Sequence, residues 1–300
     1  FDLAQDIKRS QRYLVNPKVI ALYLGKPFRL SFEDKGIVIL LNNLSNSANS
    51  FLSINGKTSI IIIYQYIIMD WVIVIPSYQR PVALREKTLN TLCSYNIPLE
   101  RIFIFVANDE EAVIYAKENP NYKIIVGVMG LASQRNFILD YFDMGTQIVS
   151  LDDDIESIYQ LVSKKEQKME RLPDFAEFTD QVFSQLKESH LQLAGIYPVK
   201  NAFFMYNTMT TDLRFCIGCL NWFINDKISL CEKVIQKDDY ERTLISYLKY
   251  NGVLRYNMIC VKTKFHNVGG LGVDRTELNE ADVDMLTQLY CEYVRIWRRK

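Results

Sequence analysis

The sequence as a whole has no excess of either positive or negative charge. Its 300 residues include 35 Lys and Arg and 35 Asp and Glu, so the formal net charge is zero. A strongly basic surface over the whole chain, the electrostatic mark of many nucleic-acid-binding proteins, is therefore excluded, although a local basic patch stays compatible with the composition. The hydrophobic content of 49% suffices for a full core in one large domain, with or without an appendage.

Histidine is nearly absent, and cysteine is scattered. The chain has two His and six Cys, and Cys216-Ile-Gly-Cys219 forms its single CxxC pair. A structural zinc site needs a second such pair or nearby His, and the sequence offers neither. We therefore expect free thiols, mostly packed in apolar surroundings, in a reducing compartment.

We expect no secretory leader, and only one apolar run is long. The first ten residues are charged, so we expect a protein that is not secreted. The run Ile60–Pro76 has the length of a membrane span but is interrupted by Gln65 and Asp70. Its β-branched and aromatic residues favour two adjacent strands, and we therefore expect no membrane span.

A regular alternation of strands and helices begins at Trp71. Apolar strands are predicted at 71–76, 101–107, 122–128 and 147–151, with helices at 81–95, 108–115 and 131–141. Near-continuous apolar strands separated by helices predict an α/β fold, with a mostly parallel sheet flanked by helices. Ligands of such sheets bind beyond the carboxyl ends of the strands, which is where the polar motifs of this chain fall.

The remainder of the chain is less regular. Residues 1–68, which include the polar stretch NNLSNSANS, are interpreted as an accessory N-terminal segment of unknown role, followed by one domain over 69–300. Its second half, 161–300, is predicted to be mixed. We expect a charged surface loop at 163–171, helices at 173–190, 238–250 and 276–299, and strands within 191–220 and 253–263.

Three consecutive aspartates, Asp152-Asp153-Asp154, follow the fourth strand. Adjacent carboxylates repel one another, and a bound cation removes that repulsion. Magnesium typically takes one or two carboxylates together with substrate phosphates. The alternative is that the acids stabilise the first turn of a following helix.

Two further polar motifs lie in the second half. Asp238 and Asp239 stand at a predicted helix start, where they are either N-capping residues or a general base. His266 precedes a glycine-rich loop in which Gly269 and Gly270 would let backbone N–H groups approach phosphate oxygens. The alternative for His266 is an ordinary loop residue. The loop is not a P-loop, because the Gly-Lys-Ser/Thr ending is absent.

Four motifs occur in order over about eighty residues: Pro76-Ser77-Tyr78-Gln79-Arg80, Asn108-Asp109-Glu110, Gly130–Asn136 and Leu151–Asp154. As a set they resemble the nucleotide-binding half of family 2 and related GT-A glycosyltransferases. The resemblance implies a GT-A-like fold, with residues 69–160 forming a nucleotide-sugar half and 161–300 an acceptor half.

The resemblance also implies roles for individual residues. Nucleotide-sugar binding would fall to Pro76, Ser77, Tyr78, Arg80, Asp109, Arg135, Asp152 and Asp153, with Gly269 and Gly270 at the diphosphate. Asp154 would ligate the metal, assisted by Asp152 and His266. Asp239 would be the general base, with Asp238 as the second choice. The acids Glu110-Glu111 depart from the family pattern and leave Asp109 open. Core packing is the alternative for Tyr78, and a helix-surface position is the less favoured alternative for Arg135.

A closer resemblance covers about residues 71–295. Segments that carry it are IPSYQRP, SLDDDI, NAFFM, TDLR, KDDYERT, NGVLR and KTKFHNVGGLG. Together they are similar to the TET/JBP-associated glycosyltransferases of phages, large DNA viruses and some eukaryotes. The resemblance implies transfer of a sugar to a hydroxymethylated pyrimidine in DNA, with Asp212 and Arg214 lining the acceptor side. It also implies a location in the cytoplasm, the nucleus or the interior of a virus-infected cell.

The expected chemistry is sugar transfer with inversion from a UDP- or GDP-sugar, assisted by Mn²⁺ or Mg²⁺. Three alternatives remain open at this point. In the first alternative, the acceptor is a glycan, a lipid or a protein instead of DNA; the balanced net charge favours this alternative. In the second, the chain is a nucleotidyltransferase, although the loop after the first strand lacks the expected glycines. In the third alternative, the chain is an inactive nucleotide-binding module. The intact acid run argues against this alternative. The oligomeric state is not indicated.

Overall fold

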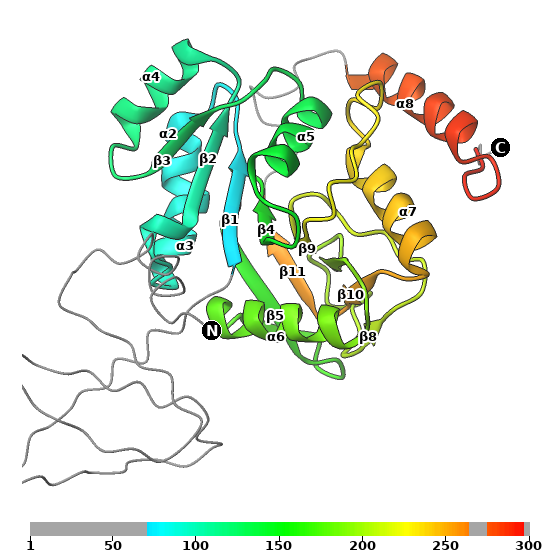
Figure 1. Cartoon of the computed structure of the whole chain (residues 1–300). Helices are drawn as coiled ribbons and strands as arrows, with labels where there is room; N and C mark the ends of the chain where they lie inside the picture. The colour runs from blue at the N-terminus through cyan, green and yellow to red at the C-terminus, as the bar shows by residue number, and fades with distance from the viewer. Residues whose placement is uncertain (1–70, 264–274, 297–300) are drawn as a thin grey trace, which may run out of the picture. The chain divides into compact units, whose positions relative to one another are not determined.

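The computed structural model describes residues 71–263 and 275–296 (Figure 1). The accessory segment predicted at 1–68 lies outside the described residues. His266, Gly269 and Gly270 lie outside them too, so the roles given to these three residues stay predictions. From Trp71 onward the chain alternates strands and helices, as the sequence predicts.

Four parallel strands form the first half of the main sheet. They are β1 (Trp71–Pro76), β2 (Ile102–Val106), β3 (Lys123–Val126) and β4 (Gln147–Leu151), in the order β3-β2-β1-β4. Helix α4 (Asp109–Glu118) follows β2, and α5 (Leu131–Tyr141) follows β3. The strands are rich in Ile, Val and Phe because a sheet that is covered on both faces must be apolar on both.

The connection between β1 and β2 is helical and contains one widened turn. It comprises α2 (Pro81–Leu84), a π-helical turn, η2 (Arg85–Leu89), and α3 (Asn90–Ser94), and a 3-10 turn, η3 (Leu99–Arg101), precedes β2. Pro81 occupies the first helical position, where no N–H is needed and its fixed φ suits the helix.

The second half of the chain extends the same sheet. The strands β7 (Leu193–Ile196), β8 (Met209–Thr210), β9 (Leu220–Ile224) and β10 (Leu254–Tyr256) continue it in the order β4-β9-β7-β10-β8. β9 is antiparallel to both β4 and β7, β10 is parallel to β7, and β8 is antiparallel to β10. The sheet is therefore mostly parallel with a mixed second half, which confirms the predicted fold class.

Each face of the sheet is covered by its own helices, because side chains alternate along a strand. Ile73 and Ile75 of β1 belong to the core that packs against the helices from Pro81 to Ser94, α4 and α6 (Phe175–Glu188). Val74 belongs to the core on the opposite face, which packs against α5 and α7 (Asp238–Tyr250). The carboxyl ends of the strands remain the edge that is available to a ligand.

The charged loop predicted at 163–171 is wrong, because this stretch is part of a hairpin. Strands β5 (Ser157–Ser163) and β6 (Lys168–Arg171) pair antiparallel and form a second sheet with β11 (Ile259–Lys262), in the order β11-β5-β6. Met169 packs against a small apolar cluster, while Lys168 and Glu170 point away from it and pair at 2.6 Å. Exposed charged residues therefore concealed a strand whose single apolar residue, Met169, is partly buried.

Helix α8 (Arg275–Leu289) follows, and it ends before the predicted residue 299 because the chain turns at Tyr290–Tyr293. Within the described ranges, none of the helices combines the length and apolarity that a membrane crossing requires. All six cysteines are free, as expected, and both members of the CxxC pair are buried.

Candidate active site

The loop after β1 is fastened to the acid run by a chain of hydrogen bonds. The backbone N–H of Arg80 donates to the Tyr115 hydroxyl at 2.9 Å, and that hydroxyl lies 2.7 Å from Ser77 Oγ. Ser77 Oγ donates in turn to Asp153 Oδ2 at 2.6 Å. With Tyr115 donating to Ser77, every polar group in the chain of bonds has a partner, as buried groups require. Burial raises the pKa of Tyr115 to about 12, so it stays a protonated donor.

Asp153 is the member of the acid run that points into the protein. It is 6% exposed, and its Oδ1 pairs with Arg80 Nη1 at 3.3 Å. Burial raises the pKa of Asp153, while the bond from Ser77 and the Arg80 charge lower it. Through these contacts, Asp153 holds the Pro76–Arg80 loop in place.

Two threonines of the connecting helical segment hold the backbone of the acid run. Thr88 Oγ1 donates to the Asp152 carbonyl at 2.7 Å and accepts from the Ile155 N–H at 2.9 Å, while Thr91 Oγ1 donates to the Ile155 carbonyl at 3.0 Å. Neither threonine was predicted from the sequence. The sequence pattern that could have indicated their role is a pair of threonines three residues apart on the buried face of a helix.

The outer aspartates of the run are partly exposed. The Asp152 side chain is 41% exposed, and Asp154 Oδ1 accepts a hydrogen bond from Thr263 Oγ1. The dense protein surroundings raise the pKa of Asp152 to about 7; Arg135 opposes this rise, while Asp153 and Asp154 add to it. Its exposure allows solvent to screen part of these interactions. The run leaves β4 in a turn, which directs Asp153 inward and leaves Asp152 and Asp154 on the outer side.

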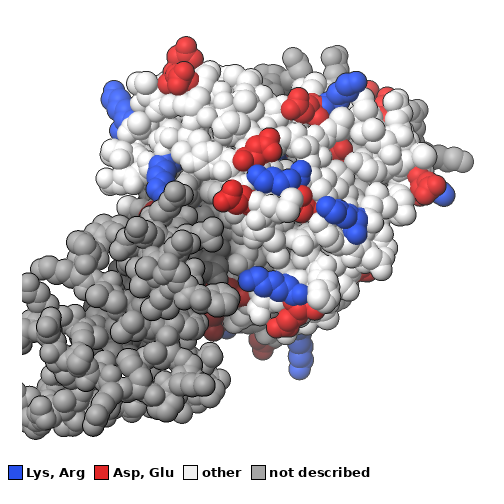
Figure 2. All heavy atoms as spheres, viewed as in Figure 1, with Lys and Arg blue, Asp and Glu red and all other residues white. Residues whose placement is uncertain are grey.

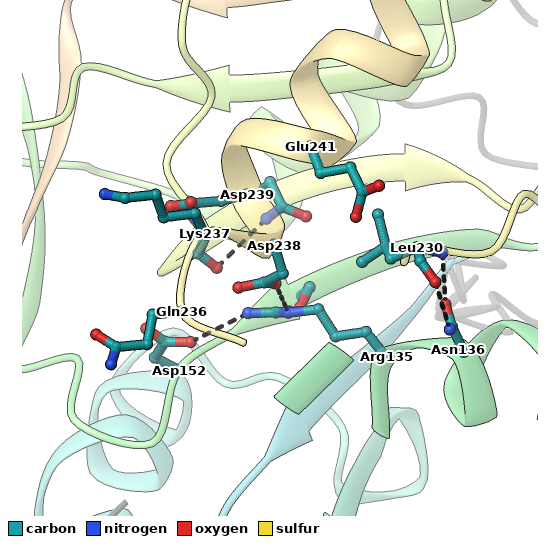
Figure 3. Close-up of polar contacts among 12 residues, drawn as sticks. Arg135, Asn136, Asp152, Leu230, Gln236, Lys237, Asp238, Asp239 and Glu241 are labelled. Atoms are coloured by element: carbon teal, nitrogen blue, oxygen red, sulfur yellow. Dashed lines mark hydrogen bonds and ion pairs between the residues drawn. The ribbon is translucent and has the colours of Figure 1, made fainter. Parts of the chain in front are cut away.

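Arg135 of α5 joins the acid run to the start of α7 (Figure 3). Its guanidinium is 6% exposed and pairs with Asp238 at 2.5 Å and with Asp152 at 3.6 Å. It also donates to Ser150 Oγ at 2.9 Å. The side chain that the sequence assigned to the nucleotide is thus enclosed between carboxylates from two elements far apart in the chain.

The two acids of α7 differ in their surroundings. Asp238 is 4% exposed and engaged by Arg135, whereas Asp239 is partly exposed. Asp239 Oδ2 accepts from the Gly218 N–H at 3.0 Å, and a Cβ added at Gly218 would lie 3.2 Å from the Asp239 Cβ. The N-cap of α7 is Lys237, without a side-chain capping bond, so neither aspartate is the N-cap. Burial and the neighbouring Asp238 raise the pKa of Asp239 to about 7, against the lowering effect of Gly218 N–H and Arg135.

The acid that contacts the Pro76–Arg80 loop from α4 is Glu111. Its Oε2 accepts from the Gln79 N–H at 2.8 Å, and its side chain is buried. Asp109 is exposed in the first turn of the same helix, after the N-cap Asn108. Tyr78 is half-buried and accepts from the Gln79 side chain at 3.0 Å. The sequence pattern that could have drawn attention to Glu111 is the spacing Asn108-x-x-Glu111, which is a capping-box pattern.

Asp212 and Arg214 pair with each other at 2.9 Å, and each side chain is half-exposed or more. Asp212 borders an open depression of about 450 Å³ whose other lining residues are Gln185, Met209, Thr210, Thr211 and Leu254. The Arg214 carbonyl accepts from Cys216, and the Cys216 N–H donates to Thr243 of α7, so this pair is linked to α7 through intervening residues.

A divalent cation fits the outer carboxylates. Asp152 and Asp154 are oxygen ligands on the exposed side of the run, and magnesium-type sites complete their shell with phosphate oxygens and water. The described part of the chain contains no group of three or more metal-binding side chains. A cation held here would therefore depend on oxygens from a substrate or on residues outside the described ranges, such as His266.

Comparisons with known proteins identify similar structures but no family. No family model and no curated protein matches the chain. Among solved structures, S. aureus TarS 1-349 in complex with UDP-GlcNAc is 14% identical over 76% of this chain and 68% of that one, with a TM-score of 0.47. The mannosyltransferase PcManGT from Pyrobaculum calidifontis in complex with GDP-Man and Mn²⁺ is 14% identical, covering 77% and 66%, at 0.46. Glucosyl-3-phosphoglycerate synthase from Mycobacterium tuberculosis, with Mn²⁺, UDP and glucosyl-3-phosphoglycerate, is 9% identical, covering 72% and 78%, at 0.44.

The chain spans only part of the proteins that it resembles. Its matches cover 57% of one TarS 1-349 chain and 40% of the longer TarS chain. With TM-scores below 0.5 and identities of at most 15%, these similarities establish nothing about the chemistry of this chain.

We expect the acids of the site to make stability fall as the pH rises. A carboxyl whose pKa is about 7 when folded and about 4 when unfolded binds more protons in the folded state between these values. Its contribution to the free energy of unfolding is complete below about pH 4 and disappears as the pH passes about 7. Raising the pH from about 5 to about 8 should therefore lower the Tm of the wild type more than that of Asp239→Asn.

Calorimetry at several pH values measures this difference, with exposed Asp140→Asn as the control that should behave like the wild type. An equal fall in Tm for the wild type and Asp239→Asn would contradict the expectation.

Proposed function

We propose that this chain is a glycosyltransferase that moves a sugar from a nucleotide-diphosphate sugar to an acceptor hydroxyl with the help of a divalent cation. The observation that carries the proposal is the Arg135 bridge, which places Asp152 of the acid run and Asp238 of α7 around one guanidinium. The outer carboxylates of the acid run, Asp152 and Asp154, are suited to a cation. The bridge connects this run to the start of α7, where Asp239 is suited to proton transfer.

The donor would lie beyond the carboxyl ends of β1 and β4, against the Pro76–Arg80 loop. Asp152 and Asp154 would hold a cation between themselves and the diphosphate. The cation would act there as a Lewis acid that stabilises negative charge on the departing nucleoside diphosphate. Asp153 supports the site indirectly, because its bonds to Ser77 and Arg80 fix the loop.

Asp239 is the better candidate for the general base. A base is most effective when its pKa lies near the working pH, and the pKa of Asp239 is raised to about 7. Asp238 is buried against Arg135 and has no comparable access. In the proposed step the acceptor oxygen bonds to the anomeric carbon and its proton passes to Asp239. The bond from that carbon to the phosphate oxygen breaks, and the nucleoside diphosphate leaves with the electron pair, which inverts the anomeric centre.

Asp154→Asn should abolish sugar transfer while leaving the fold intact. The amide preserves the shape of the side chain and can still accept from Thr263, but it removes a charged oxygen ligand. Thermal shifts with UDP- and GDP-sugars, with and without Mn²⁺, measure the loss: stabilisation by nucleotide plus metal should appear in the wild type and in the exposed Asp140→Asn control, and disappear in Asp154→Asn. If no nucleotide stabilises the wild type, the glycosyltransferase proposal fails.

Asp239→Asn should lower kcat by roughly 10²- to 10⁴-fold, the range associated with loss of a general base. Donor Kd should stay within about twofold, because Asp239 would act on the acceptor. Steady-state kinetics together with calorimetric titration of the donor separate the two effects. Full activity in Asp239→Asn would remove this residue from the mechanism.

We propose a hydroxymethylated pyrimidine in DNA as the acceptor, on the basis of the sequence resemblance and of one surface. This aromatic surface consists of Phe203, Phe204 and Tyr206, which are 59%, 50% and 57% exposed, with Lys164 Nζ 4.5 Å from the Tyr206 ring centroid. It follows β7, which runs parallel to β4, so the chain leaves both strands at the same edge of the sheet. Exposed rings beside lysines suit stacking with bases and contact with phosphates.

A glycan, lipid or protein acceptor is the alternative, and the distribution of charge favours it. On the face shown in Figure 2, basic and acidic side chains are interspersed, and neither sign forms a continuous patch. DNA binding normally depends on a continuous patch of basic side chains, which neutralise the phosphates. The two acceptor classes therefore require a direct comparison.

Tyr206→Ala should weaken DNA binding by roughly 5- to 150-fold, which corresponds to the loss of about 1–3 kcal/mol of base stacking. Fluorescence anisotropy with hydroxymethylpyrimidine DNA measures the Kd, and Val113→Ala, an exposed apolar residue of α4, is the matched control. Transfer assays should offer the same DNA and simple sugar acceptors. Transfer to sugars alone, without DNA binding, would exclude the DNA acceptor and leave the glycosyltransferase proposal standing.

A further inference from the structure

The segment before α7, residues 225–237, has no helix or strand of its own and is held by side chains from other elements. On one side, Asn136 of α5 makes two bonds to the Leu230 backbone, donating to its carbonyl at 2.9 Å and accepting from its N–H at 2.7 Å (Figure 3). Irregular backbone needs such partners because its polar groups lack those that a helix or sheet provides.

On the other side, α8 supplies a buried carboxylate. Asp282 is 0% exposed, and its two oxygens accept three consecutive backbone N–H groups. Oδ1 accepts from Ile235 at 2.8 Å, and Oδ2 accepts from Gln236 at 2.5 Å and Lys237 at 3.0 Å. A buried carboxylate is costly unless several donors satisfy it, and here three backbone groups do so.

The position of these three donors gives Asp282 influence over the site. Lys237 is the N-cap residue of α7, and the next two residues are Asp238 and Asp239. The Lys237 side chain makes no capping bond, and a carboxylate from another helix fixes the turn that leads into α7. The backbone that places the two aspartates is therefore fixed by a residue more than forty positions later in the chain.

A second contact, from the turn that follows α8, fixes the far side of the same region. The Tyr290 hydroxyl donates to Glu241 Oε1 at 3.0 Å, and Glu241 Oε2 accepts from the Cys231 N–H at 2.9 Å. Glu241 is buried, at 2% exposure. Helix α8 and the turn that follows it thus contact both the segment directly before α7 and the first turn of α7 itself.

We propose that Asp282 is a positioning residue for sugar transfer, which holds residues 235–237 so that Asp239 lies at the distance and angle that removal of the acceptor proton requires. The inference rests on the proposed function. Asp282 touches no reacting atom in this scheme and acts through the backbone alone. Small displacements of a catalytic group suffice for large losses of rate, about 100-fold for 1 Å.

Asp282→Asn tests the proposal with little change in shape. The amide nitrogen has no acceptor capacity, so an N–H of residues 235–237 loses its partner in either orientation of the side chain. We expect kcat to fall by roughly 10- to 100-fold, with donor KM and the Kd for UDP or GDP within about twofold of the wild type. Amide hydrogen exchange should accelerate at residues 235–239.

Asp284→Asn is the matched control, because Asp284 is an exposed acid on the same helix and should change none of these quantities. Tyr290→Phe serves if Asp282→Asn does not fold, since it removes one hydrogen bond and should lower kcat less, again with donor KM unchanged.

The outcomes separate this inference from the proposed function. Unchanged kcat in Asp282→Asn, or unchanged exchange at residues 235–239, would overturn the positioning role alone. A parallel loss of kcat and nucleotide affinity would also overturn it, because it would mark a general structural defect. A wild type that transfers no sugar would overturn the glycosyltransferase proposal and this inference together.

Discussion

A single buried guanidinium connects the two halves of the candidate site. Arg135 pairs with Asp152 and Asp238, and a Cβ added at Gly218 would lie within 3.5 Å of both Arg135 and Asp239. One positive charge therefore faces more carboxylates than it can balance. Ion pairs of this kind lose much of their attraction to desolvation, so they indicate organisation rather than stability. When Asp152 and Asp239 are ionised, the carboxylates outnumber Arg135, and the exposed side of the cluster then favours a cation.

The three aspartates of the acid run have different positions and different contacts. Asp153 points inward and joins the run to the loop after β1 through Ser77, while Asp152 and Asp154 stay on the outer side. Thr88 and Thr91 fix the backbone beneath them. The outer carboxylates are therefore held against their mutual repulsion largely by polar contacts to the main chain that carries them. Such support keeps ligand oxygens in place before any ligand arrives.

The sequence predicted those parts of the molecule that depend on local pattern. Helices 131–141 and 238–250 and strands 71–76 and 147–151 have the predicted bounds, because apolar periodicity and strand-end signals determine them. Contacts between distant segments were not predictable. The Arg135 bridge, the choice of Glu111 in place of Asp109 at the loop, and the bonds of Asp282 all depend on the three-dimensional fold. The 163–171 hairpin was missed because its exposed charges outnumber its one partly buried apolar side chain, Met169.

The π-helical turn at Arg85–Leu89 has a consequence for sequence change in this region. A π turn holds one residue more than an α turn, and such turns often occur at functional sites. Removing one residue from it would replace it with a regular α turn and shift the side chains within the turn, Thr88 among them, relative to the acid run. Thr88 and Thr91 would then no longer both face the acid run. Insertions and deletions should therefore be tolerated less here than point substitutions, although the segment contains none of the proposed metal ligands.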